Sequence, residues 1–356
     1  MFVAEAPGAV DGAPAATLRR RILVPVSAAF AVLIAVCAAG VRIPEALQYA
    51  PFVISLVAFG LPHGALDHLV PARLAGRAPT LRSIGGVVLL YAVLGAAVMA
   101  AWALAPAAAF VGFIAITWFH WGQGDLYVLL ALDRAGYLCG SYKRQRMLRA
   151  AAITVRGALP MLVPLIAFPA VYAGVATAAT TLFDPAAAGQ LTAIIDPTVR
   201  AALAVGFAVL VVGYAVVTGV LAQRAGADSP RAWRRDLLEI VVLTAFFAVV
   251  PPVLAIGLYF CLWHAVRHII RLEMLDEEAR GSLRRGRLLP VAARFARDAA
   301  PITVIALVIL VLFFVLLPPA SGAGASLGVY LVLISALTLP HIVIVSLMDR
   351  RQQLWR

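Results

Sequence analysis

The sequence predicts an all-α integral membrane protein, a polytopic bundle of about ten transmembrane helices with both termini in the cytoplasm. Three observations support this fold class. The composition is 63% hydrophobic and 13% charged, whereas soluble domains are about 45–50% apolar and about 25% charged. Apolar stretches of about 20 residues, enough to cross a bilayer core, recur along the whole chain. The arginines gather in alternate connections between these stretches.

The apolar stretches give ten candidate spans in order: 21–41, 50–71, 82–104, 107–131, 148–168, 198–222, 235–250, 252–273, 300–317 and 325–348. Four residues interrupt the fifth span: Arg156, Pro160, Pro164 and Pro169. Residues 170–183 could therefore form a further half-helix. Two consecutive prolines, Pro251 and Pro252, are expected to form a hinge between spans seven and eight.

The predicted domain organisation is simple, because no soluble domain remains once the spans are assigned. The Ala-, Gly- and Pro-rich start predicts a disordered tail over residues 1–20. Residues 21–348 are expected to form a single transmembrane catalytic domain, followed by a short cytoplasmic tail over 349–356. The first apolar run is longer than a signal-peptide core, so we expect it to be retained as a span.

The basic residues test the span assignment independently of hydropathy, because positively charged loops stay on the cytoplasmic side. They cluster at both ends of the chain and in alternate connections: Arg19 to Arg21, Arg73 to Arg82, Arg134 to Arg149, Arg224 to Arg235, Arg280 to Arg297, and Arg350 to Arg356. The basic residues of the remaining connections are only Arg42 and Arg200. The net charge of +12 thus matches a cytoplasmic face on anionic lipid in a multi-pass protein of the cell (inner) membrane, and requires no nucleic acid partner.

All six histidines fall in four short motifs within apolar runs: PHGALDH (62–68), WFHWG (118–122), WHAVRH (263–268) and LPH (339–341). An imidazole in hydrocarbon costs free energy unless a partner satisfies it. The motifs lie on spans two, four, eight and ten, all of which run from outside to inside. The histidines are therefore expected at similar depth in the inner half of the bilayer, where they could form one metal site between helices.

Four histidines are the expected ligands. His264 and His268 are four residues apart and share a helical face. His63 lies between a proline and a glycine, and His120 is followed by two nearby glycines, which gives room for close approach. For His341 the sequence leaves two roles open: lining the site, or making a structural hydrogen bond. His68 lies about 140° around the helix from His63, so we expect it to support the site or to be structural.

The residues around the histidines are expected to support the ligands or to line the substrate path. Asp67 and Asp125 are expected to accept a hydrogen bond from a ligand imidazole and so fix its tautomer. The alternatives are direct ligation of the metal and a hydrogen bond at a helix end or between helices. Arg267 should pair with one of these acids or extend to the interface. Five aromatic residues either line a narrow tunnel or simply pack: Trp118, Phe119, Trp121, Phe260 and Trp263.

The motifs GLPHGALDH, FHWGQGD, WHAVRH and LPHIVIV resemble the signatures of the Brp/Blh family, the bacteriorhodopsin-related β-carotene 15,15′-dioxygenases. Order and spacing match from about residue 50 to the C-terminus. The resemblance implies a membrane Fe(2+) enzyme that uses O₂ to split β-carotene at its central double bond into two all-trans retinal molecules. The implied iron ligands are His63, His120, His264 and His268, with no further catalytic residue. Four imidazoles leave an octahedral ion two positions for O₂ and the polyene.

Other functions remain as alternatives. A membrane lipid hydroxylase or desaturase commonly needs eight or more histidines, and this chain has six. A haem-binding electron-transfer protein needs axial pairs, which His63, His120 or His341 could supply. A retinal-binding receptor would need an intramembrane lysine, but the only lysine, Lys143, lies in a predicted cytoplasmic loop. The chain is therefore expected to supply retinal to an opsin rather than to be one.

Overall fold

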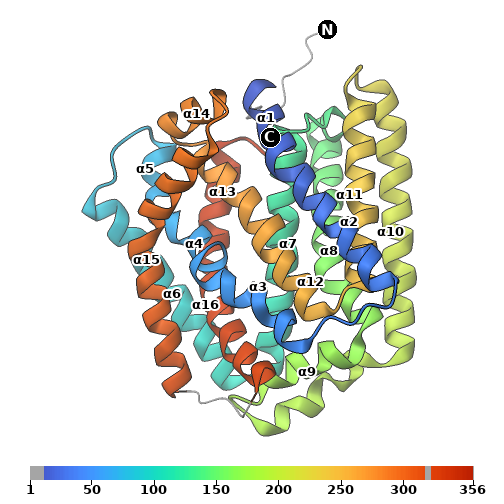
Figure 1. Ribbon diagram of the computed structural model, residues 1–356, viewed down its shortest axis with the longest axis vertical. Helices are drawn as coiled ribbons and strands as arrows, with labels where there is room; N and C mark the ends of the chain where they lie inside the picture. Colours follow the sequence, from blue (N-terminus) through green and yellow to red (C-terminus); the bar gives the residue numbers. More distant parts are fainter. Residues whose placement is uncertain (1–11, 317–321, 356) are drawn as a thin grey trace.

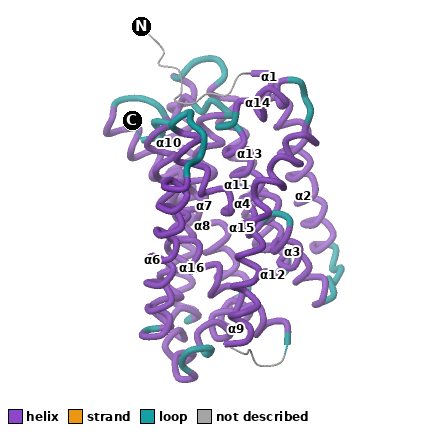
Figure 2. The backbone as a smooth tube through the Cα atoms, turned by 90° about the vertical axis from the view of Figure 1, so that its left-hand side faces the viewer, coloured by secondary structure: helices purple, strands orange, loops and turns teal. Residues whose placement is uncertain are grey.

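The computed structural model describes residues 12–316 and 322–355, apart from the side chains of residues 12, 13, 188 and 192–194. Over these residues the chain is helical and contains no strand (Figures 1 and 2). The helices run mostly along the long axis of the molecule and form a bundle. The all-α fold predicted from composition and hydropathy is therefore confirmed.

Ten helices lie in the ten predicted spans of the described chain, in the predicted order: α2 (Val24–Ala38), α3 (Glu45–Val57), α6 (Leu81–Leu104), α7 (Pro106–Ala131), α8 (Tyr142–Ala167), α10 (Pro197–Arg224), α11 (Ser229–Val249), α12 (Pro252–Leu258), α15 (Leu288–Leu316) and α16 (Ala323–Arg351). Eight helical segments of the described chain are long and apolar enough to cross a membrane. α7 and α11 occupy the two further predicted spans without belonging to these eight. The chain is thus a polytopic membrane bundle, and ten remains the predicted number of crossings.

Short elements complete the chain: α1 (Gly12–Leu18), η1 (Arg19–Leu23), α4 (Gly60–Ala65), η2 (Leu66–Leu69), α5 (Val70–Leu74), η3 (Gly136–Leu138), α9 (Pro169–Thr180), η4 (Pro185–Ile195), η5 (Tyr259–Ala265), α13 (Val266–Glu273) and α14 (Glu277–Arg284). α9 is the predicted half-helix, and the break before α12 is the predicted proline hinge. In Figure 1, α1, α5, α14 and the end of α16 lie at one end of the bundle, and α9 lies at the other. The arginine-rich segments at α1, α5, α14 and the end of α16 therefore share one end of the bundle.

The two ends of the chain are more ordered than the sequence suggested. Residues 12–20, expected in a disordered tail, are helical, because Leu18 is buried in the core and Arg19 donates to the Leu132 carbonyl at 3.1 Å. The remainder of that predicted tail, residues 1–11, lies outside the described residues. At the other end, α16 continues to Arg351 and Leu354 is buried. The predicted C-terminal tail thus begins as helix and packs back onto the bundle.

Close packing between α7 and α8 sets how α7 faces the interior. A Cβ on Gly122 would lie 2.1 Å from the Ile153 carbonyl oxygen, and one on Gly157 would lie 1.9 Å from the Trp118 carbonyl oxygen. Only glycine permits this approach of the two backbones. Because these contacts hold one face of α7 against α8, the opposite face, which carries His120, turns away from α8 and toward the bundle centre.

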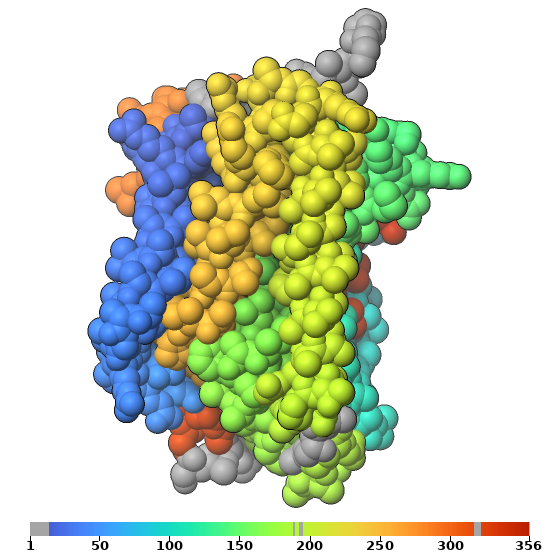
Figure 3. All heavy atoms as spheres, turned by 90° about the vertical axis from the view of Figure 1, so that its right-hand side faces the viewer, coloured from blue at the N-terminus to red at the C-terminus, as the bar shows by residue number. Residues whose placement is uncertain are grey.

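Farther around the bundle, α11 packs between α2 and α10 (Figure 3).

Two irregular helices lie at the level of the histidines. The second predicted span is interrupted after α3, and α4 begins at Gly60, where a Cβ would lie 2.7 Å from the Phe260 ring and 2.8 Å from Ser55. The eighth predicted span contains the π-helical segment η5, which carries His264. π-Helical segments and interrupted membrane helices are frequent at functional sites. The backbone is therefore least regular where the polar residues gather.

Candidate metal centre

Five of the six histidines converge in the interior of the bundle. We call His63 on α4, His120 on α7, His264 on η5, His268 on α13 and His341 on α16 the histidine cluster; each side chain is buried. Neighbouring ring centroids are 4.7–6.3 Å apart, the shortest separation being that of His120 and His264. This arrangement agrees with the prediction that separate helices bring their imidazoles to a similar depth in the bundle.

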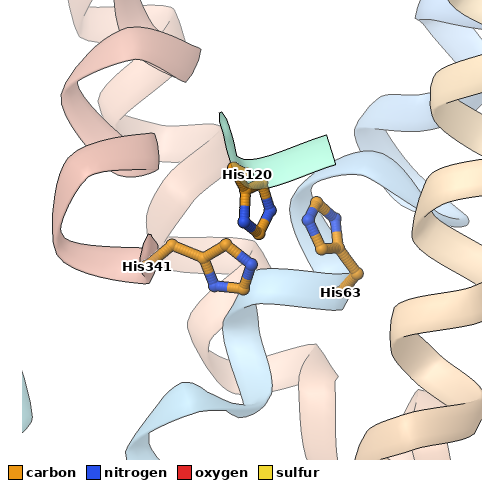
Figure 4. Close-up of side chains that lie close together, drawn as sticks. All are labelled: His63, His120 and His341. Carbon is orange, nitrogen blue, oxygen red and sulfur yellow. The ribbon is translucent and has the colours of Figure 1, made fainter. Parts of the chain in front are cut away.

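Hydrogen bonds at Nδ1 orient three of the rings. The Nδ1 of His63 bonds to the Gly60 carbonyl oxygen, and that of His120 lies 3.4 Å from the side-chain oxygen of Gln123. The Nδ1 of His341 lies 2.7 Å from an Asp67 oxygen. When Nδ1 carries the proton, Nε2 keeps a free lone pair. Figure 4 shows the rings of His63, His120 and His341 turned toward one another.

The donor set fits a metal ion. His63, His120 and His341 each offer a ligand atom within 4.8 Å of the others, and so do Asp67, His268 and His341. An ion about 2.1 Å from each nitrogen would hold neighbouring ligands about 3 Å apart and opposite ligands about 4.2 Å apart, so modest side-chain adjustment completes such a site. Within the described structure, both ring nitrogens of His268 and the Nε2 of His341 are buried without hydrogen-bond partners. Buried polar atoms of this kind need a ligand or a bond.

The sixth histidine lies outside the cluster. The Nδ1 of His68 bonds to the Ala65 carbonyl oxygen at 2.7 Å, and the ring is only partly buried. The 140° offset from His63 predicted this separation. The four expected ligands are all members of the histidine cluster. His341, for which the sequence left two roles open, is its fifth member.

The two carboxylates predicted to orient imidazoles have different partners. Asp67 accepts from His341 rather than from its helical neighbour His63, and it also accepts from the Tyr91 hydroxyl at 2.5 Å. Asp125 does not take the expected role, since its oxygens accept from the Trp263 indole nitrogen and pair with two arginines. Tyr91 was not foreseen, because a lone tyrosine in an apolar span carries no distinguishing signal.

A buried ion cluster lies beside the histidines and consists of Asp125, Arg156, Asp236, Glu239 and Arg267. Arg156 lies 3.2 Å from Asp125 and 3.0 Å from Asp236, and also pairs with Glu239. Arg267 lies 3.1 Å from Asp125 and 2.8 Å from Glu239. Arg267 therefore takes the first of its two predicted roles, pairing with an acid. The sequence signal for the rest of the cluster was the presence of Arg156 and Glu239 inside apolar spans.

An elongated apolar cavity of about 530 Å³ ends at the histidine cluster. This volume lies within the range of about 300–1,000 Å³ typical of ligand pockets. Along α7 the lining includes Phe110 and His120, which lie ten positions or about 15 Å of helix apart. On α15 it is lined from Ile302 to Phe313. The cavity thus extends from the cluster toward the end of the bundle that carries α9.

The five aromatic residues predicted to line a tunnel divide into two groups. Trp121 and Phe260 line the cavity. Trp263 is buried behind the cluster against Arg267, with 3.8 Å between the guanidinium carbon and the ring centroid. Trp118 donates to the Thr154 carbonyl oxygen of α8 at 2.9 Å, and Phe119 is 38% exposed. These three side chains do not line the cavity, because α7 and η5 turn them toward other helices or outward; Trp118 and Trp263 take the packing alternative.

The lining residues missed on α7 follow the helical period from His120. Residues three and four apart share a face, so the face that contains His120 also contains Phe113, Thr117 and Trp121, all of which line the cavity. This period was available in the sequence. It would have favoured Thr117 and Phe113 over Phe119.

Comparisons with known proteins agree with the geometry. The family model described as Beta-carotene 15,15′-dioxygenase matches residues 54–349. The chain belongs to this family. It is 45% identical over 314 residues, 88% of either chain, to the probable beta-carotene 15,15′-dioxygenase Blh of Halobacterium salinarum. It is 29% identical over 354 residues, 95% of this chain and 93% of the relative, to the probable beta-carotene 15,15′-dioxygenase Brp of the same species. No solved structure matches the chain.

The match confirms the family that the four motifs resembled, and it is a family of enzymes. All five residues of the histidine cluster lie inside the matched region. A shorter match, 34% identical over 73 residues, covers 20% of this chain and 26% of a beta-carotene 15,15′-dioxygenase from an uncultured marine bacterium. Residues 1–53, with the whole first predicted span and the connection that follows it, lie outside the family model.

Proposed function

We propose that this chain cleaves β-carotene with O₂ at the central 15,15′ double bond and releases two molecules of all-trans retinal. We further propose that the histidine cluster holds one Fe(2+) ion for this reaction. The names of the relatives support the reaction. The structural observation that supports it best is the apolar cavity lined at one end by four buried imidazoles of the histidine cluster, those of His63, His120, His264 and His341.

The cavity suits an extended hydrocarbon. Its lining is almost wholly aliphatic and aromatic, and the histidines are the main polar groups at its inner end. The rings of Trp121 and Phe260 lie 5.6 and 6.3 Å from the His264 ring. They are placed to pack against a polyene and to keep water from the cluster.

The residues at the inner end have a limited task in the chemistry. One C=C bond and one O₂ become two C=O groups, so the overall reaction neither consumes nor releases a proton and no general acid is required. When bound, iron supplies the redox chemistry by which O₂ reacts with the double bond. Neutral imidazole is a common ligand of iron. The chain itself orients these ligands and fixes which bond lies beside them.

The cavity also reaches the side of the bundle. Val88 on α6 and Ile305 on α15 both line it, and they are 52% and 54% exposed. Hydrophobic side chains exposed on a membrane bundle face lipid. We propose that β-carotene and O₂, which both partition into hydrocarbon, enter from the bilayer between α6 and α15. A location in the cell membrane and transfer of the product to a retinal-binding opsin are parts of the same proposal.

Expression in a bacterial cell that makes β-carotene tests this function. The wild-type chain should discharge the orange colour and produce retinal, two molecules per β-carotene lost. His120→Ala should leave the pigment intact, whereas Phe119→Ala, its exposed neighbour on α7, should behave as wild type. Intact pigment with correctly inserted wild-type protein would contradict the proposal. Hydroxylated forty-carbon products would favour a hydroxylase, and a Soret band would favour a haem protein.

A further inference from the structure

His341 occupies a central position in the histidine cluster, although neither the spacing of the motifs nor the family resemblance placed it among the ligands. Its ring centroid lies 4.8 Å from those of His120 and His268 and 5.1 Å from that of His63. Two sets of described residues could hold a metal ion, and His341 belongs to both. A metal ion held by either set would therefore contact His341.

Two further residues hold the His341 ring. Its Nδ1 lies 2.7 Å from an oxygen of Asp67, and the hydroxyl of Tyr91 donates to that same oxygen at 2.5 Å. Asp67 is 1% exposed. A carboxylate that accepts a hydrogen bond from Nδ1–H keeps the proton on Nδ1 and leaves the lone pair on Nε2. It also makes Nε2 a better electron-pair donor to a metal. This is the arrangement commonly found behind metal-ligating histidines.

The other nitrogen of His341 lacks any such partner. Its Nε2 is buried and makes no hydrogen bond to any described residue, and Figure 4 shows the ring directed toward those of His63 and His120. A histidine that served only to join α16 to η2 through Asp67 would gain nothing from burying its second nitrogen without a bond, because such burial costs free energy.

We infer that His341 is a metal ligand through Nε2, and that Asp67 and Tyr91 are the residues that position it. The inference rests on the proposed metal-dependent function and extends the four expected ligands by one. It distinguishes His341 from a purely structural histidine, whose loss would change stability and leave the affinity and spectrum of the metal as they were.

Metal binding by the purified full-length protein tests the inference without measuring cleavage. Affinity for Fe(2+) is measured anaerobically, and Co(2+) is used as a spectroscopic probe of the ligands. His341→Ala should weaken Fe(2+) binding and change the visible spectrum of bound Co(2+). Asp67→Asn should weaken binding about 10–100-fold, and Tyr91→Phe should weaken it less. Val343→Ala, whose side chain is 42% exposed on the same helix, is the matched control and should match wild type in both measurements.

The possible outcomes distinguish a failure of the inference about His341 from a failure of the proposed metal-dependent function. A His341→Ala protein with wild-type affinity and an unchanged Co(2+) spectrum would overturn the inference while leaving the proposed function intact. If that variant does not insert, Asp67→Asn decides, because it keeps the side-chain shape while removing the charge and replacing one acceptor oxygen by an amide donor; wild-type affinity and spectrum there would overturn the inference equally. A wild-type protein that binds neither metal would overturn the proposed function itself.

Discussion

The Nε2 atoms of His120 and His264 lie 3.1 Å apart, although the two residues are 144 positions apart in the chain. This is close to the separation of about 3 Å expected for adjacent ligands of one ion. Replacing either residue by alanine should abolish retinal formation, to less than about 1% of wild type, because each would remove a donor from the same site. Retinal is measured chromatographically per amount of inserted protein. Wild-type retinal formation by either variant would remove that histidine from the site.

The cavity along α15 offers a second prediction. Ala306 lines it between Ile302 and Phe313. A tryptophan at this position should occupy the path of the polyene and reduce cleavage at least tenfold, while leaving metal content unchanged, since the substrate must lie in this space. Val308→Trp places the same bulk on the lipid-facing side, where Val308 is 63% exposed. Equal cleavage rates for the two tryptophan variants would show that the substrate does not use this cavity.

The sequence predicted more of the site than of its surroundings. The depth of His63, His120, His264 and His268 followed from span boundaries and charged loops, which depend on hydropathy alone. The rotation of each helix about its axis did not follow, because helices that are apolar all round carry little amphipathic signal. For this reason the sequence left open whether Phe119 lines a tunnel or packs, and its side chain is 38% exposed.

The sequence also could not predict which side chains far apart in the chain are hydrogen-bond or ion-pair partners. Asp67 was expected to serve a nearby histidine, but its partner is His341, 274 residues farther along the chain. Asp125 was treated in the same way and instead joins the ion cluster with Arg156 and Arg267. Spacing along one helix specifies neighbours on that helix only. The pairing of η2 with α16, and of α7 with α8 and α13, depends on packing that no single segment encodes.

Arg156 should be essential for stability. It is fully buried and pairs with three carboxylates. Arg156→Ala would leave these acids buried without their common partner, at a cost of about 3–5 kcal/mol. The free energy or temperature of unfolding in detergent measures the effect. Arg146→Ala on the same helix removes an exposed side chain that bonds to Tyr142, and should change stability by no more than about 0.5 kcal/mol. Similar melting temperatures for both variants would refute this role.

Asp133, in the connection after α7, should make stability depend on pH. Burial raises the pKa of its carboxyl to about 6, and the charge of Glu239 adds to this, while Arg19, Arg267 and Arg235 act in the opposite direction. Because the folded-state pKa lies above the ordinary value of 3.8 for an aspartate, the stabilising contribution of Asp133 is fully present below pH 3.8 and is lost as pH rises through about 6.

The melting temperature of Asp133→Asn, measured against wild type from pH 4 to pH 8, checks this sign. The variant cannot ionise at this position, so its advantage over wild type should grow as pH rises. Asp228→Asn replaces a side chain that is 77% exposed and should leave the melting temperature unchanged at each pH. A difference between Asp133→Asn and wild type that shrinks with rising pH would show that the ion pair with Arg19 outweighs burial.

Reconstitution of the purified, metal-free protein measures the central claim most directly. One equivalent of Fe(2+) is added, followed by β-carotene and O₂, and both the carotenoid and the products are quantified. The histidine cluster and its cavity predict two retinal molecules for each β-carotene consumed, with none formed before metal is added. Equal retinal formation by the metal-free protein, or intact β-carotene beside stoichiometrically bound iron, would contradict the account.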